Sequence, residues 1–459
     1  MGDIIVEMSM NHTGDALTAF HWTPQPKAEA VVRKLCGEFL AGNLFAAKLA
    51  LRMKEESGTR FVDWLDHFSL PDSSELRGEL VEAGFVLRGE AYVHEGGIFP
   101  VIVLRNKEAM EAAIKVESVV DFLVANHVIA QEGVEGPPLA PVRRVRVNSE
   151  GGAELWIVER HGTKDLKLTD WSPNEAVSAL GHLEAFRLRR RLFADESEGI
   201  SRAGRLIDAA VADLGQGYAA DLFFSAEREY WQSRNRAARA QKTRQDRLGL
   251  GWANHDHHTY RSSRQHFAPM IALFEKLGLT CRERFYAGAD SGWGAQVMEH
   301  PAGFVVFADV DLSPDELRGD FAHEGLAPRN KLGTVGLWCA LHGEAILQAG
   351  MHHLECQFDF EALKKQLEEE EKIKVMNPFT NFSYLRQAFT EGEIWAVEES
   401  RVARLLANGQ ITAGQAEQFR GKGALGSHLE NLERNEGFKG FNQTGVSDII
   451  ARTDPRREA

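Results

Sequence analysis

Two segments far apart in this chain follow the same order of elements. Residues 61–123 read as a strand, a helix and three further strands, and this order returns after Gly251. Aligning the first strand of each unit places "DHFSL" (66–70) over "DHHTY" (256–260), so that His67 falls on His257. An internal repeat of this kind indicates repeated supersecondary units. We therefore expect an α+β fold in which repeated βαβββ modules form curved mixed sheets, with a helical insertion between them.

The segments outside these two units also show a pattern. Apolar spacing over residues 28–56 predicts two helices that break near Gly42, and residues 172–247 are strongly helical. A third, divergent copy is indicated near residue 350, where a His-bearing strand runs into a helix. The expected parts are a helical lead-in (1–60), a first module (61–160), a helical insertion (161–250), a second module (251–325) and a third module with C-terminal closure (326–459).

Composition excludes several classes of protein. The formal net charge of −14 argues against a general nucleic-acid surface, and no window approaches the roughly 18 apolar residues of a membrane span. The N-terminal "MGDIIVEMSMNHTGD" has acidic residues and no long apolar core, unlike a secretory signal. The four cysteines are widely spaced and form no CxxC pair. We expect a cytoplasmic protein; the oligomeric state is left open.

Strand alternation separates the histidines of "HDHHTYR" into two faces. In the first unit, Phe68 and Leu70 define an apolar face that should meet the helix. The alignment then places His257, Thr259 and Arg261 on the opposite face, where a curved sheet would form a cup. His257 is the first metal-ligand candidate.

The same alternation in "GMHHLECQF" favours His353 as a second ligand. Two histidines and one carboxylate form the commonest open site for divalent iron, so a third ligand should be acidic. The segment "GEIWAVEES" offers Glu398 and Glu399, with Glu393 just upstream.

The repeat itself provides a competing site. If the first two modules pair, His67 and His257 would be joined by Glu117, or by Asp309 or Asp311. His257 belongs to both alternatives.

Arg261 adds a function beyond metal binding. It lies four residues after His257 on the same strand face, and its guanidinium could bind a substrate carboxylate through two hydrogen bonds. Such an arrangement suits a 2-oxo acid. Thr259, between the two, is the other candidate for substrate binding.

Paired βαβββ units with a His on the first strand and a Glu near the end resemble the vicinal oxygen chelate superfamily, which includes glyoxalases, extradiol dioxygenases and hydroxyphenylpyruvate dioxygenase. The order "HHTYR", "MHHLE", "GEIWAVEESR" is similar to the 2-oxoadipate dioxygenase/decarboxylase family. This resemblance implies His257, His353 and Glu398 as metal ligands and Arg261 as the carboxylate binder.

The function that we expect is a mononuclear metal-dependent oxygenase, with Fe(II), acting on a small 2-oxo or hydroxy carboxylic acid and on dioxygen. One alternative is a redox-neutral isomerase or lyase with Zn(II) or Ni(II). The other is a non-enzymatic ligand-binding protein.

Overall fold

The structure is a computed structural model that describes residues 22–287, 291–442 and 454–456. The first 21 residues of the expected lead-in, and residues 443–453 and 457–459 of the expected closure, lie outside the described residues. The fold is α+β with two mixed sheets, which confirms the predicted fold class. In the described part of the chain, no helix is long and apolar enough to cross a membrane.

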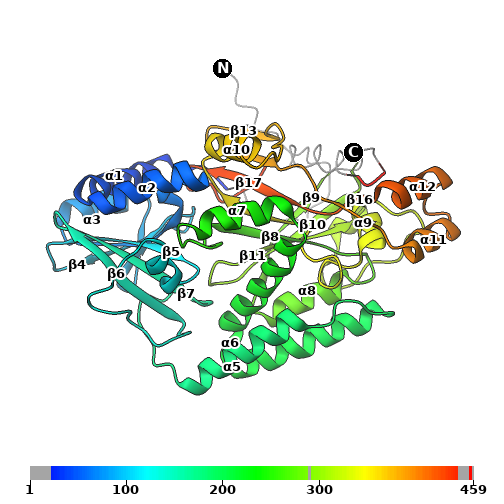
Figure 1. The fold of residues 1–459 in the computed structure, drawn as a ribbon, viewed down its shortest axis with the longest axis horizontal. Helices are drawn as coiled ribbons and strands as arrows, with labels where there is room; N and C mark the ends of the chain where they lie inside the picture. Colours follow the sequence, from blue (N-terminus) through cyan, green and yellow to red (C-terminus); the bar gives the residue numbers. More distant parts are fainter. Residues whose placement is uncertain (1–21, 288–290, 443–453, 457–459) are drawn as a thin grey trace.

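Sheet A is the N-terminal sheet, and one of its faces is covered by α1, α2 and α3, with which it shares an apolar core (Figure 1). Helices α1 and α2 meet at Asn43, one residue after Gly42, so the predicted break is confirmed. The strand order of sheet A is β2 (Val86–Arg88), β3 (Ala91–Val93), β4 (Val101–Arg105), β1 (Leu65–Pro71), β5 (Met110–Val116), β7 (Ala153–Arg160) and β6 (Val142–Glu150). Its helical elements are α1 (Pro26–Gly42), α2 (Leu44–Ser57), η1 (Phe61–Trp64), α3 (Ser74–Glu82) and α4 (Val119–Ala125).

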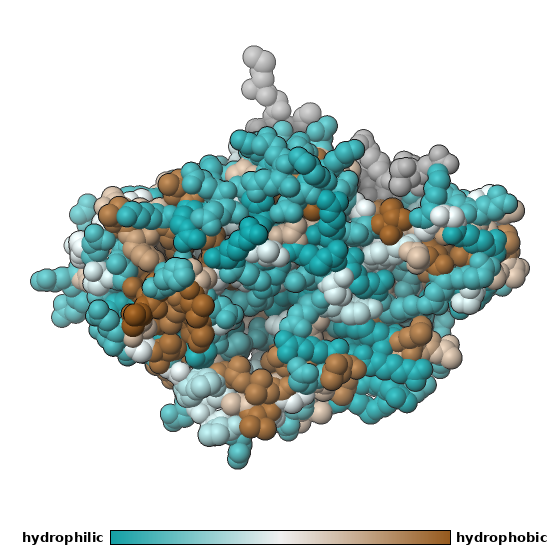
Figure 2. Space-filling model, in the orientation of Figure 1, coloured by the Kyte–Doolittle hydropathy of each residue, from teal (hydrophilic) through white to brown (hydrophobic). Residues whose placement is uncertain are grey.

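Three helices, α5, α6 and α7, connect the last strand of sheet A to the first strand of sheet B along the chain. Helices α5 and α6 pack side by side along the lower edge of Figure 1. Gly215 has a φ of 78° and divides α6 into two helical segments, a conformation that glycine adopts without strain. Figure 2 shows apolar side chains gathered over α5, on which Val177, Leu180 and Leu188 are exposed. The helices are α5 (Pro173–Leu188), α6 (Glu196–Ser233) and α7 (Arg236–Asp246).

The strands of sheet B bury one face against α6 and α8. His258 stacks on Phe224 of α6 with ring centroids 4.6 Å apart, and Tyr260 contacts Phe274 of α8 at 5.0 Å. The order is β13 (Thr380–Phe382), β14 (Leu385–Phe389), β17 (His428–Arg434), β12 (His353–Gln357), β8 (His255–Arg261), β11 (Val305–Asp311), β10 (Trp293–Glu299) and β9 (Thr280–Tyr286). Around it lie α8 (Phe267–Lys276), η2 (Pro314–Arg318), α9 (Thr334–His342), α10 (Phe360–Glu369), α11 (Glu399–Ala407), α12 (Ala413–Lys422) and the small pair β15 (Ile394–Trp395) and β16 (Ala424–Leu425).

Each large sheet consists of two units placed side by side. In sheet A, β1 is parallel to β4 and antiparallel to β5, which is parallel to β7. In sheet B, β8 is parallel to β11 and antiparallel to β12, which is parallel to β17. His67 and His257 occupy equivalent places, because they pair with Val101 and Val305 in the same parallel arrangement.

His161 links the end of β7 to α6. Its Nδ1 lies 2.8 Å from Asp221 Oδ2, and its Nε2 lies 3.0 Å from Glu159 Oε1. Burial alone would lower the pKa of His161, but hydrogen bonds to the two carboxylates outweigh it and raise the pKa to about 10. The imidazolium form is therefore favoured in the folded chain.

We expect His161→Gln to lower the melting temperature most at or below pH 6.5, and progressively less as the pH rises towards 10. A raised pKa stabilises the folded state fully below the unfolded value of 6.5, and this contribution is lost through about pH 10. The loss should be on the order of 5 kcal/mol, since the pKa rises from 6.5 to about 10 and each pKa unit is worth about 1.4 kcal/mol. Thermal melts of both proteins across this range measure it; a difference that does not change with pH would contradict the assignment.

Candidate metal centre

The polar face of sheet B brings together two histidines and a glutamate. His257 of β8, His353 of β12 and Glu430 of β17 each offer a ligand atom within 4.8 Å of the other two, and all three side chains are buried. These strands are consecutive in the sheet, and neighbouring strands lie about 4.8 Å apart. Two imidazoles and one carboxylate form the donor set of non-haem iron sites. The group could therefore hold a divalent metal ion.

The carboxylate of this group was missed in the sequence, although a short repeat marks it. The tripeptide His-Leu-Glu occurs three times, at 182–184 in helix α5, at 353–355 and at 428–430. In the structure the last two copies stand side by side on parallel strands, with His353 opposite His428 and Glu355 opposite Glu430. Both glutamates therefore share the face that carries His257.

Each candidate imidazole ligand is oriented by a partner on its Nδ1. The Nδ1 of His257 lies 3.3 Å from Glu355 Oε2 and 3.5 Å from Asp256 Oδ2, while its Nε2 lies 3.8 Å from Glu430 Oε2. The Nδ1 of His353 lies 3.4 Å from the Nδ1 of His352, and its Nε2 lies 3.0 Å from Glu430 Oε2. Metal-bound histidines commonly use this arrangement. Both Nε2 atoms are thus directed towards the same carboxylate.

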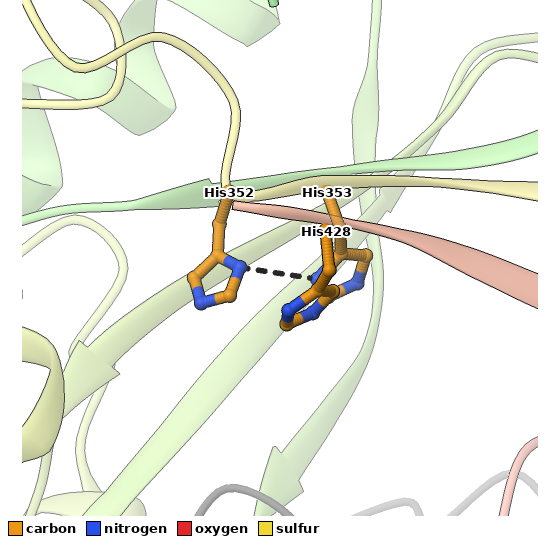
Figure 3. Close-up of side chains that lie close together, drawn as sticks. All are labelled: His352, His353 and His428. Carbon is orange, nitrogen blue, oxygen red and sulfur yellow. Dashed lines mark hydrogen bonds between the residues drawn. The ribbon is translucent and has the colours of Figure 1, made fainter. Parts of the chain in front are cut away.

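A second group of potential ligands adjoins the first and shares His353. Figure 3 shows His352, His353 and His428 side by side, with the hydrogen bond between His352 and His353. The Nε2 atoms of His352 and His428 have no hydrogen-bond partner among the described residues. This all-imidazole group has no carboxylate to offset a cation, and burial, followed by the charge of Arg261, lowers the pKa of His352 and of His428. The group with Glu430 is therefore the better metal site.

Buried carboxylates crowd the same face. The Gln387 amide lies 3.3 Å from Glu355 Oε2 and 3.4 Å from Glu430 Oε1 and links the two side chains. Burial raises the pKa of Glu430 to about 8, and burial together with the charge of Glu430 raises that of Glu355 well above its usual range. Two carboxylates in a dry environment favour a bound cation, because a cation removes the cost of burying their charge.

Arg261 lies four residues after His257 on β8, and its side chain is 1% exposed. Its Nε is 3.8 Å from Asp309 Oδ2, too long for a hydrogen bond, and its guanidinium lies 5.6 Å from the ring centroid of Trp338. Burial lowers the pKa of Arg261 to about 10 and raises that of Asp309 to about 7. The Arg261 Nε and Nη1 donate to no described residue, so the guanidinium retains donors for a ligand.

A cavity of about 600 Å³ connects this face to the opposite sheet. His257, Glu355, Gln387 and Phe307 line its sheet B side, together with residues of sheet A and α6. A volume of this size is typical of sites for small molecules. Of the three candidate ligands only His257 lines this cavity, so the candidate centre meets a space large enough for a small molecule at that residue, while His353, Glu430 and Arg261 lie behind the cavity wall.

The structure does not bring Glu398, Glu399 or Glu393 to the histidines. Glu398 is the residue before α11, and its Oε1 accepts a hydrogen bond of 2.8 Å from Gln348 at an exposed position. Glu399 pairs with Arg420 at 2.7 Å, and Glu393 accepts a hydrogen bond from the Arg236 backbone. The carboxylate beside His257 and His353 is Glu430 instead.

The competing site from the first module is also not assembled. His67 lies in sheet A, where its Nδ1 is 2.6 Å from Asp66 Oδ2, and Glu117 pairs with Lys242. Asp311 accepts backbone hydrogen bonds at the start of α9, and Asp309 faces Arg261. Among the described residues, none of these carboxylates belongs to a cluster of potential metal ligands that includes His257.

Thr259, the second residue expected to bind substrate, contacts a candidate ligand. Its Oγ1 lies 2.8 Å from the Nε2 of His353. The hydroxyl of Thr259 therefore lies at the candidate centre, where it is hydrogen-bonded to the imidazole of His353.

Sheet A does not repeat the donor set. Strand register places Glu111 of β5 where sheet B has His353, and Trp156 of β7 where it has Glu430. Only the histidine of the first strand, His67, is retained. The candidate centre is therefore confined to one of the two sheets.

No protein-family model matches the sequence, and no curated protein sequence matches it. Several solved structures are similar in fold. A putative glyoxalase superfamily protein from Ralstonia eutropha JMP134 has 13% identity and a TM-score of 0.32, over 58% of this chain and 97% of that one. A putative hydrolase from Shewanella frigidimarina NCIMB 400 has 15% identity and a TM-score of 0.28, over 46% and 91%. The Mn(II)-bound glyoxalase from Novosphingobium aromaticivorans has 7% identity and a TM-score of 0.19, over 81% and 82%.

These similarities are remote and say nothing about substrate or reaction. The neighbours also include a catechol 2,3-dioxygenase, so both named glyoxalases and a named dioxygenase occur among them. Similarity to the 2-oxoadipate family is not supported by these matches.

We expect Glu430→Gln to lose bound divalent metal and Glu398→Gln to keep it. Loss of an outer partner already weakens metal binding by roughly 10–100-fold, so loss of a ligand should cost more. Metal content after dialysis, measured by mass spectrometry for wild type and both variants, checks this. Equal retention in both variants would contradict the ligand set.

Proposed function

We propose that this protein is a mononuclear metal-dependent enzyme that acts on a small carboxylic acid. In this proposal His257, His353 and Glu430 hold one divalent metal ion, and Arg261 binds the substrate carboxylate. The observation that supports it is the juxtaposition of this donor set with a buried guanidinium whose Nε and Nη1 have no hydrogen-bond partner among the described residues.

The donor set fits a divalent metal. The Nε2 of each imidazole is directed towards Glu430, and burial, aided by the charge of His428, lowers the pKa of His353 well below its usual range, which keeps that imidazole neutral. When bound, such an ion orients substrate oxygens and, as Fe(II), activates dioxygen.

The residues of the chain have separate tasks in this proposal. Glu355 and Asp256 lie 3.3 and 3.5 Å from His257 Nδ1 and orient its ring by charge, and the hydrogen bond with His352 orients the ring of His353. Arg261 stays charged at neutral pH, since its pKa of about 10 is still high, and fixes the carboxylate end of the substrate. Positioning both ends of a small molecule is a large part of catalysis.

Within this class we propose an Fe(II) dioxygenase for a 2-oxo or hydroxy carboxylic acid. The mixed set of two imidazoles and one carboxylate is typical of iron oxygenases that keep open positions. Protein loaded with Fe(II) under anaerobic conditions should consume oxygen in an electrode assay with at least one member of a 2-oxo acid panel. Absence of uptake by fully loaded protein would contradict the dioxygenase and favour a redox-neutral Zn(II) or Ni(II) enzyme.

The metal can be tested without any activity. Protein purified without added metal should contain close to one equivalent that disappears in His257→Ala. Unchanged metal content in that variant would overturn the proposed centre.

We expect Arg261→Gln to leave metal content unchanged and to lower kcat/KM for the carboxylic acid by about 10–100-fold. A hydrogen bond to a charged group is worth roughly 1.5–3 kcal/mol, and 1.4 kcal/mol is tenfold. Arg187→Gln is the matched control, because Arg187 forms an exposed ion pair with Glu229 on α6. Steady-state kinetics of the three proteins measure the effect; equal values for wild type and Arg261→Gln would contradict the role.

A further inference from the structure

One buried arginine in the described part of the chain lacks a carboxylate partner. Seven arginines are buried there, and six of them form ion pairs. The exception is Arg228 of α6, which is 4% exposed. Its side-chain hydrogen bonds within the described ranges go to neutral groups, from Nη1 to His258 Nε2 at 3.2 Å and from Nη2 to Ser225 Oγ at 2.9 Å. Its Nε has no partner among the described residues.

A second cation on the wall of the same cavity has no partner for its side chain. The side chain of Lys115 of β5 forms no hydrogen bond or ion pair with any residue that the structure describes. Lys115, Arg228 and Ser225 all line the cavity between the two sheets, which His257 lines on its sheet B side. Burial lowers the pKa of the Lys115 ammonium, and the positive charge of Arg228 lowers it further. The negative charges of Asp66 and Asp221 act in the opposite direction.

The nearby carboxylates are already neutralised. Arg160 binds Asp66 through both oxygens, at 2.6 and 2.7 Å, and Asp221 lies 2.8 Å from the charged His161. Arg228 and Lys115 therefore have no carboxylate within ion-pair distance on the wall of the cavity, in a chain whose net charge is −14. Burying an unpaired charge is costly, and chains seldom retain one unless a ligand completes it.

We propose that Lys115 and Arg228, with the Ser225 hydroxyl, bind an oxyanion in the cavity between the sheets. Ser225 Oγ accepts from Arg228, so its own O–H is free to donate to the same ligand. The ligand is a carboxylate or a phosphate group, since both accept several charge-assisted hydrogen bonds. The site uses no candidate metal ligand and does not depend on the metal centre.

Calorimetric titration of the full chain at low ionic strength tests this, with inorganic phosphate and with acetate as probes. We expect saturable binding with a stoichiometry near one, and the anion that binds more tightly identifies the chemical source. Lys115→Met and Arg228→Gln should each weaken binding by at least about tenfold. Lys107→Met is the matched control, because Lys107 precedes the same strand and is paired with Glu111.

The outcomes separate this site from the proposed enzyme. Glu430→Gln should bind the anion as tightly as wild type, whatever happens to its metal. If Arg228→Gln does not fold, Lys115→Met alone carries the test. No saturable binding to wild type, or equal binding by Lys115→Met and wild type, would overturn the proposal.

Discussion

The antiparallel pairing of β8 with β12 is the interaction on which the candidate centre depends. It places His257 opposite Glu355 and Thr259 opposite His353, and the parallel pairing of β12 with β17 then adds Glu430. Side chains alternate along a strand, so a slip of one residue would turn the candidate ligands towards the apolar core. The packing of His258 and Tyr260 on α6 and α8 opposes such a slip. Apolar burial on one face therefore sets the chemistry of the other.

The electrostatics of the open face follow from the same geometry. Alternation places every second residue of four adjacent strands in one dry layer, and here those residues include imidazoles, carboxylates and a guanidinium. Glu355 and Glu430 share one amide, and Arg261 has only a distant partner in Asp309. Such a layer contributes little to the stability of the fold, because the attraction between buried charges offsets only part of their desolvation cost. Groups of this kind are typical of functional sites.

Part of this site could be predicted from local sequence. Alternation within "HDHHTYR" and "MHHLE" is enough to place His257, Arg261 and His353 on polar faces, because each face is defined by apolar neighbours within a few residues. The helix pair that breaks near Gly42 is predictable for the same local reason. These features need no knowledge of which strands become neighbours.

The third candidate ligand could not be predicted in this way. Glu430 lies on a strand that crosses back to pair with β12, after α11 and α12 have intervened, so its position depends on strand order. Glu398 occurs in a similar-looking acidic segment, but its backbone carbonyl begins a helix by accepting from Arg401, and its side chain is exposed. The His-Leu-Glu tripeptides at 353–355 and 428–430 were the available signal, and only their parallel pairing in the sheet distinguishes them from the copy at 182–184 in α5.

The two sheets share one architecture but have different inventories of side chains. Sheet A keeps a histidine on its first strand and has Glu111 and Trp156 where sheet B has a histidine and a glutamate. Residues of both sheets line the cavity, but the candidate donor set lies on sheet B alone. Substitutions on the sheet A wall would therefore change the shape and charge of the cavity without moving any candidate ligand.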